Sequence, residues 1–314
     1  MSDPRSSDPF AELDRLACGA GFVPEETAMR TRALQAATHR PVPGGALTEA
    51  IARTLLSHRH DRVALFTGFV LPDAFPCGEN DGPLGTVALA RALDRAGFDV
   101  TICADPPVVD GVTWLAAEIG VGIPIASIPS EPAALADSFD VAFAIEKPGV
   151  NAAGHLHTWD GRRIEGGSVP IDSLFENLTA AGKLTIAIGD RGNEIGFGTI
   201  REELLSLVPE ARRCTCGCGG GTAAVTAAAL LFPAAVSNWG AYALSAALAL
   251  ELADRTLLHL PEQEERLLNV AAVRGCRDGL LRTAAFRVDG ISGSISIRIV
   301  DAMRSTVESA LAGG

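Results

Sequence analysis

Side chains that carry oxygen atoms follow several short apolar segments of this sequence, at the points where strands are expected to end. In an open sheet of parallel strands, the loops that follow the strands meet at one edge and form the ligand site. We therefore expect these side chains to lie together, with an ordinary helix cap as the alternative for Asp105. The residues at these strand ends are Thr67, Gly68, Asp105, Glu146, Asp190, Ser237 and Asn238.

Two polar loops add further carboxylates to this edge. Glu79 and Asp81 stand just before a predicted helix over 82–97, and Glu194 follows Asp190 by four residues. Clustered carboxylates need a counter-charge or must take up protons, and hard oxygen ligands suit Mg²⁺, Mn²⁺ or Ca²⁺. We predict that at least three of these side chains share one divalent cation. The predicted ligands are Glu79, Asp81, Asp190 and Glu194.

Strand-like and helical segments alternate along the chain, which predicts an α/β fold with a mainly parallel, doubly wound (Rossmann-like) sheet. Two helices within 23–58, separated by a Pro-Gly break, form an N-terminal helical arm over 1–60, followed by an α/β domain over 61–314. The alternating segments 282–290 and 291–300, with a closing helix from about Asp301, predict a small C-terminal α+β appendage. The strands are expected over 62–68, 98–105, 123–129, 140–146, 183–190 and 231–238.

Composition excludes several classes of function. The net charge of −12 over 314 residues repels phosphate backbones and anionic lipids, so neither nucleic acid nor a membrane is an expected partner. The glycine-rich segment 189–198 fits neither the dinucleotide fingerprint nor a P-loop, which argues against a nucleotide cofactor. From the polar first residues we expect no signal peptide, and we expect the seven cysteines to be reduced thiols in the cytoplasm. A small molecule is the expected partner, and a homo-oligomer stays open.

Cysteine and histidine offer a second, weaker set of candidates. Cys214, Cys216 and Cys218 are closely spaced, but no fourth ligand stands at zinc-finger spacing. We interpret them as thiols of a glycine-rich loop, with a metal or redox role as the alternative. His155 and His157 follow Glu146 in the sequence, and the choice for them is between an acid/base role and a place on the surface.

The sequence resembles the D-glutamate cyclase family in motifs spread over about residues 60–290. The resemblance implies reversible interconversion of D-glutamate and 5-oxo-D-proline with loss of water. The chain departs from the family pattern at Arg191 and Phe197, where glycine and methionine are usual, at Lys147, which replaces an arginine, and at His155, which replaces an aromatic residue. The motifs that carry the resemblance are 67–69, 79–85, 146–149, 189–198, 236–240 and, near the end, 288–290.

Roles follow from the implied reaction. Glu146 is expected to take the ammonium proton, Arg191 or Lys147 to hold the α-carboxylate, and the helix start at Gly82 to offer amides to an anion. Two other readings stay open: a metal-dependent phosphatase of a small metabolite, and a non-catalytic protein that senses a small molecule or a metal. The expected catalytic residues are Glu146, Asp190, Asn193 and Glu194. The expected substrate-binding residues are Thr67, Gly68, Gly82, Lys147, Arg191, Ser237 and Asn238.

Overall fold

A computed structural model describes residues 8–38 and 45–313 of the chain. The polar start of the sequence and most of the predicted Pro-Gly break lie outside the described residues. Among the helices of the described part, none is long and apolar enough to cross a membrane.

The centre of the molecule is a parallel sheet of six strands in the order β3-β2-β1-β4-β5-β6. The chain builds outward from β1 to β3 and then returns to place β4 on the other side of β1, so the sheet has a topological switch point between β1 and β4. This topology confirms the predicted α/β fold. The strands are β1 (Arg62–Thr67), β2 (Asp99–Ala104), β3 (Ile125–Ser127), β4 (Val141–Ile145), β5 (Leu184–Gly189) and β6 (Leu230–Pro233).

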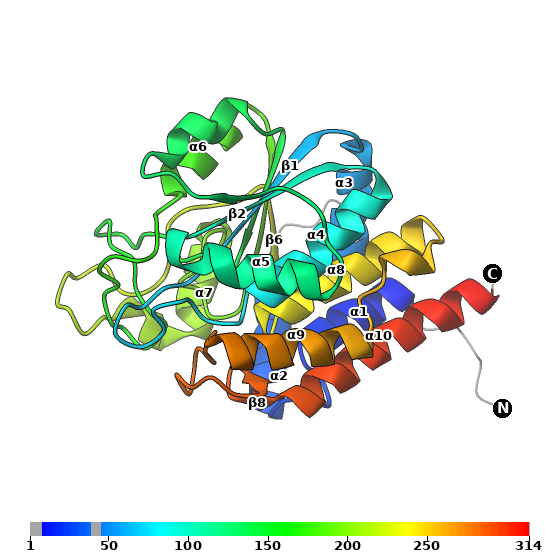
Figure 1. The fold of residues 1–314 in the computed structure, drawn as a ribbon. Coiled ribbons are helices and arrows are strands. Elements are labelled where there is room, and N and C mark those ends of the chain that lie inside the picture. The colour runs from blue at the N-terminus through cyan, green and yellow to red at the C-terminus, as the bar shows by residue number, and fades with distance from the viewer. Residues whose placement is uncertain (1–7, 39–44, 314) are drawn as a thin grey trace.

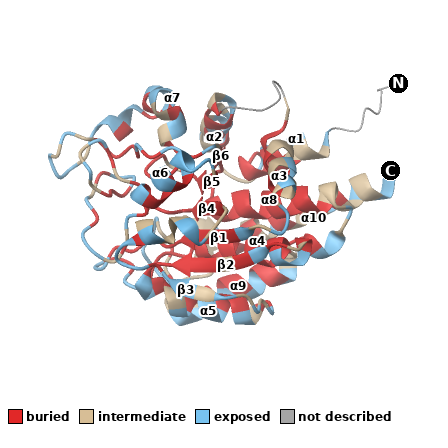
Figure 2. Cartoon of the chain, turned by 90° about the horizontal axis from the view of Figure 1, so that it is seen from above, coloured by how far each residue is buried: buried red, intermediate tan, exposed pale blue. Residues whose placement is uncertain are grey.

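Helices cover both faces of the sheet because its strands are apolar on both sides. In β1, Val63 and Leu65 pack into one core cluster while Ala64 and Phe66 pack into a second one on the opposite face. Figure 2 shows the central strands as buried along most of their length. The first face is covered by α3 (Leu47–Ser57), α4 (Pro83–Ala96), α5 (Val109–Glu118) and α8 (Ser237–Glu251). Outside these helices pack α1 (Pro9–Ala17), α9 (Pro261–Arg274) and α10 (Gly293–Gly313). The second face is covered by α2 (Glu25–Ala37), α6 (Asp172–Ala180) and α7 (Arg201–Leu207).

The N-terminal helices and the C-terminal helix pack on the same part of the domain. Helices α1, α8 and α10 contact one another, and the start of α1 and the end of α10 lie on the same side of the molecule (Figure 1). The predicted antiparallel element at the tail is a short pair, β7 (Arg287–Val288) and β8 (Ile291–Ser292).

Two predicted elements differ in the structure. The segment 293–300 is the start of α10 and not a strand, because its buried residues Ser296, Ile299, Val300 and Met303 follow helical spacing in spite of the alternating serines and isoleucines. The predicted strand over 231–238 ends at Pro233 as β6, and its last two residues, Ser237 and Asn238, begin α8.

Candidate functional site

The N-termini of α4 and α8 cap each other at the carboxyl edge of the sheet. Asp81, just before α4, accepts hydrogen bonds from the backbone N–H groups of Ser237 (3.0 Å) and Asn238 (2.8 Å) at the start of α8. In return, Asn238 Oδ1 accepts from the N–H groups of Gly82 (2.9 Å) and Gly85 (2.7 Å). Both helix starts are thus fixed in one place, with their positive dipole ends at this edge.

The carboxylates predicted at the strand ends converge on this edge. Oxygens of Glu146, Asp190 and Glu194 lie within 4.8 Å of one another, and Asp190 also lies within 4.8 Å of Asp81 and Asp289. All but Asp289 are buried. Asp190, at the end of β5, therefore links two acidic groups in the described part of the chain.

Burial and mutual repulsion hold these acids toward their protonated forms. Burial raises the pKa of Glu146 well above its usual range, and the charges of Asp190 and Glu194 raise it further. Burial also raises the pKa of Asp190, which Arg191 opposes, and raises the pKa of Asp81 to about 8, with Asp289 as a second cause. A site of this kind either holds protons or binds a cation.

Glu146 is held in an unusual backbone conformation. It follows β4 with a φ of 48°, in the left-handed region that residues other than glycine rarely adopt. Its Oε2 accepts a hydrogen bond of 2.5 Å from Ser237 Oγ. A Cβ on Gly82 would come within 2.7 Å of the Glu146 Cβ and 2.9 Å of Thr67 Oγ1, so only glycine fits there. Backbone strain of this sort gathers at functional sites, where the surrounding fold supports it.

Glu194 lies in the loop after β5 with one oxygen fixed and one unpartnered. Its Oε2 accepts from the N–H groups of Gly192 (2.8 Å) and Arg191 (3.4 Å). Its Oε1 is buried and has no hydrogen-bond partner among the described residues. A buried carboxylate oxygen without a donor is costly unless a ligand or an ion completes it.

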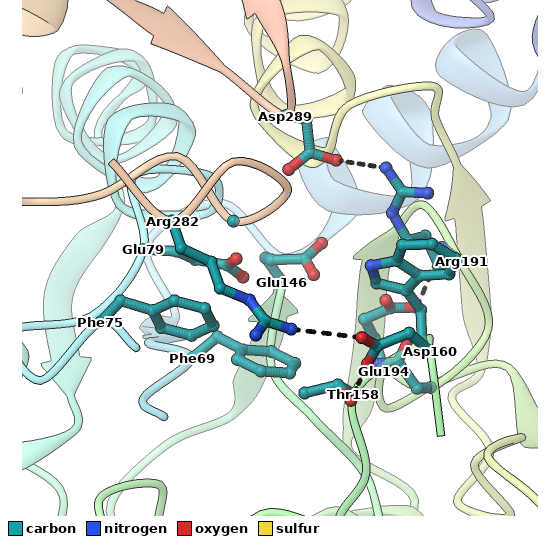
Figure 3. A pocket seen from close by; sticks show the side chains of 13 residues that line it. Phe69, Phe75, Glu79, Glu146, Thr158, Asp160, Arg191, Glu194, Arg282 and Asp289 are labelled. Atoms are coloured by element: carbon teal, nitrogen blue, oxygen red, sulfur yellow. Dashed lines mark hydrogen bonds and ion pairs between the residues drawn. The ribbon is translucent and has the colours of Figure 1, made fainter. Parts of the chain in front are cut away.

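Arg191 brings positive charge to the pocket over these carboxylates. Its guanidinium pairs with Asp289 (2.9 Å) and Asp190 (3.3 Å) and lies 4.8 Å from the centre of the Trp159 ring. Figure 3 shows Glu79 and Glu146 facing the space between Arg191 and Arg282. The residues that line this pocket are Phe69, Phe75, Glu79, Glu146, Thr158, Trp159, Asp160, Arg191, Asn193, Glu194, Gly279, Arg282 and Asp289.

The pocket is small. Its volume is about 30 Å³, which is room for about two water molecules. Arg282 pairs with Asp160 (3.2 Å) beside it (Figure 3). Both residues of this pair line the pocket and are more exposed than the carboxylates.

Lys147 lies apart from this pocket. Its ammonium is fully buried, 2.6 Å from Asp105 Oδ2, and also donates to the Gly68 carbonyl (3.3 Å). The other oxygen of Asp105 accepts from the N–H of Val169. Lys147, Gly68 and Asp105 thus form a polar unit beneath the loops and do not line the pocket. The predicted contact of Lys147 and Gly68 with substrate stays a prediction.

The predicted metal ligands come together in a different combination from the expected one. Asp190 belongs to two groups, one with Glu146 and Glu194 and the other with Asp81 and Asp289. Glu79 belongs to neither group in the described residues. Sequence reasoning left out Asp289 as a site residue. The signal for it was the Val288-Asp289-Gly290 motif, whose turn places Asp289 at a φ of 49°.

The sequence spacing offered no fourth ligand to the three cysteines, but the structure brings a histidine close to them. His157 lies with Cys214, Cys216 and Cys218 in one group of ligand atoms within 4.8 Å of one another, a group able to hold a metal ion.

Comparison with known proteins agrees with the sequence motifs. A family model described as "D-glutamate cyclase-like, C-terminal" matches residues 26–304. The chain is 32% identical over 231 residues to a human protein named D-glutamate cyclase, mitochondrial. The aligned part covers 64% of this chain and 35% of the human protein, so the chain spans about a third of that relative's length. The name of the human protein places it in mitochondria, and the cytoplasmic location expected for this chain stays a prediction.

Proposed function

The chain belongs to the D-glutamate cyclase-like family, and on that premise we propose that it is a hydro-lyase that interconverts D-glutamate and 5-oxo-D-proline plus water. The observation that supports this most strongly is the group of buried carboxylates, Glu146, Asp190 and Glu194. Glu146 and Glu194 line one small pocket together with Arg191, whose guanidinium pairs with Asp190. Acidic side chains suit the ammonium group of the substrate, and arginine suits a carboxylate.

In the forward direction, the α-nitrogen bonds to the carbon of the γ-carboxylate (Cδ of glutamate), and one oxygen of that carboxylate leaves as water. The two protons that the nitrogen loses end on that water, so the reaction needs a group that accepts a proton and returns it. Glu146 is our candidate. Ser237 Oγ holds its Oε2 at 2.5 Å, which leaves Oε1 to exchange a proton with the substrate.

Arg191 is the candidate for binding the α-carboxylate. Its planar guanidinium can grip a carboxylate through two N–H groups. Asp289 and Asp190 already pair with it, and Trp159 lies against its face, so its position is fixed before substrate arrives. Preorganisation of this kind places the reacting ends of the substrate at small further cost in entropy.

The donor set fits a hard divalent cation. The unpartnered Oε1 of Glu194 and the nearby oxygens of Asp190 and Glu146 are ligands that Mg²⁺, Mn²⁺ or Ca²⁺ prefer. We propose that Asp190 and Glu194 hold such an ion. When bound, it would supply positive charge to polarise the γ-carboxylate, which is otherwise a poor electrophile.

The test is a product assay. The protein is incubated with D-glutamate, L-glutamate or 5-oxo-D-proline, with Mn²⁺ or with a chelator, and products are identified by mass. Interconversion of the D-forms supports the proposal, with generic phosphoesters as a control. No turnover of D-glutamate or 5-oxo-D-proline under any of these conditions would refute it, and phosphate release would point to a phosphatase instead.

A further inference from the structure

We propose that His157, Cys214, Cys216 and Cys218 form a structural zinc site, separate from the carboxylate pocket. The four ligand atoms come from two loops, one after β4 and one before β6. Their atoms lie within 4.8 Å of one another, and the three thiols are free cysteines. Three cysteines and one histidine are one of the usual ligand sets of structural zinc.

The spacing of the four atoms fits a tetrahedral ion. With Zn–S of ~2.3 Å and Zn–N of ~2.0 Å, neighbouring ligand atoms around zinc are about 3.5–3.8 Å apart. In the structure, Cys214 Sγ lies 3.4 Å from Cys218 Sγ and 3.5 Å from Cys216 Sγ. His157 Nε2 lies 3.1 Å from Cys216 Sγ and 3.9 Å from Cys218 Sγ. The group can therefore accept zinc with shifts of a few tenths of an ångström.

The histidine is already oriented for metal binding. His157 Nδ1 lies 3.1 Å from the carbonyl oxygen of His155. A carbonyl can only accept, so Nδ1 carries the proton and Nε2, which faces the thiols, has a free lone pair. Metal-binding histidines are commonly held by such a bond from the other ring nitrogen.

The surrounding backbone supports the thiols as well. Asn151 Nδ2 donates to Cys218 Sγ at 3.3 Å, and the N–H of Gly220 points to the same sulfur at 3.5 Å. Donors of this kind stabilise a metal-bound thiolate. Gly217 and Gly219, on either side of Cys218, have φ values of 77° and 78°, which lets the short loop fold the three sulfurs to one side.

A zinc ion at this site would join two loops next to the pocket, and the ion itself would lie outside the pocket. His157 is followed directly by Thr158 and Trp159, which line the pocket. The carbonyl of His157 accepts from Asn193 Nδ2 (3.1 Å), next to Glu194. The same loops are also joined by the bond from Thr215 N–H to the Gly161 carbonyl (2.8 Å). We therefore assign the ion the role of holding the wall of the pocket in place.

The first measurement is the metal content of the full chain, purified in reductant and without added metal. We expect about one zinc per chain by mass spectrometry, the stoichiometry of a single four-ligand site. The cluster thiols should react with a thiol reagent only after a strong chelator is added, whereas the exposed Cys77 should react at once.

Variants then locate the ion. Cys216→Ser should lose most of the zinc, His157→Cys should retain it by supplying a fourth thiolate, and Cys77→Ser serves as the matched control with wild-type content. Native protein that neither contains zinc nor takes up Zn²⁺ or Co²⁺ would overturn the proposal, as would zinc that stays bound in Cys216→Ser. A disulfide among the three cysteines, found in protein kept in reductant, would also overturn it. None of these readouts depends on catalytic activity.

Discussion

The substitution Glu146→Gln tests the proton-transfer role most directly. Glutamine has the size of glutamate and can still accept the hydrogen bond from Ser237 Oγ, so the side chain should keep its place. What it loses is the ability to take a proton at the free oxygen. General acid–base catalysis is worth ~10²–10⁴ in rate, which is about 3–5 kcal/mol at 1.36 kcal/mol per tenfold. We expect kcat for D-glutamate to fall by that factor and KM to change little, since the loss belongs to the transition state.

The same substitution should raise the stability of the fold at high pH, although it lowers kcat. Burial and neighbouring carboxylates raise the pKa of Glu146, so its ionised form destabilises the fold at neutral pH when no cation is bound. Glutamine resembles the protonated acid, and the variant should unfold at a higher temperature than wild type at pH 8 in the presence of a chelator. At pH 4 the two proteins should differ little.

The assay is initial-rate kinetics by mass-detected product, together with thermal unfolding at both pH values. Glu264→Gln is the matched control: Glu264 is also a buried glutamate, but it bonds to Tyr242 and Ser296 away from the pocket. We expect it to lose stability and to keep turnover per folded molecule. Wild-type kcat in Glu146→Gln would refute the role of Glu146 and move the search for the base to other pocket residues.

Three further predictions concern charge. First, the pKa of Asp81 rises from the ordinary 3.8 to about 8, and a group with a raised pKa stabilises the fold at low pH and loses that contribution as pH rises. In chelator the free energy of unfolding should therefore fall between about pH 4 and pH 8, and calorimetry should show proton release when Mn²⁺ binds; stability flat over this range would contradict the reasoning. Second, Lys147→Met leaves Asp105 buried without its partner and should cost about 3–5 kcal/mol in denaturant unfolding, whereas a change below 1 kcal/mol would show that the pair contributes little. Third, Arg191→Lys keeps the charge but loses the two-point grip, so KM for D-glutamate should rise more than kcat falls; an unchanged KM would remove Arg191 from substrate binding.

Much of the site could be predicted from the sequence because the carboxyl ends of parallel strands lie at the same edge of the sheet. Thr67, Glu146, Asp190 and Asn238 come from four separate strand ends, and the order of the sheet brings them together. Lys147 could not be placed in this way. It follows Glu146 by one residue, and the left-handed backbone of Glu146 (φ 48°) departs from the extended geometry that the strand-end rule assumes. The rule therefore does not place the Lys147 side chain, which pairs with Asp105.

Other features were hidden because they depend on contacts across the fold. His157 and the three cysteines are 57 or more residues apart, and no local spacing rule joins them. The start of α10 alternates serine and isoleucine like a strand, yet Ser296 bonds to both Trp239 and Glu264, a contact that only the packed helix provides. Tertiary packing overrides local pattern at such positions.

The exchange of caps between α4 and α8 has a consequence for how the chain folds. Asn238 Oδ1 and the N–H of Gly82 are separated by 156 residues in sequence, so this contact closes a very long loop, and contacts of that kind form slowly. The frame of the pocket therefore cannot exist in an N-terminal fragment. It needs α8, which follows β6 and supplies many residues of the first core cluster. The docking of α8 thus completes the exchange of caps at the acidic edge and also adds to the hydrophobic core that holds the carboxylates together.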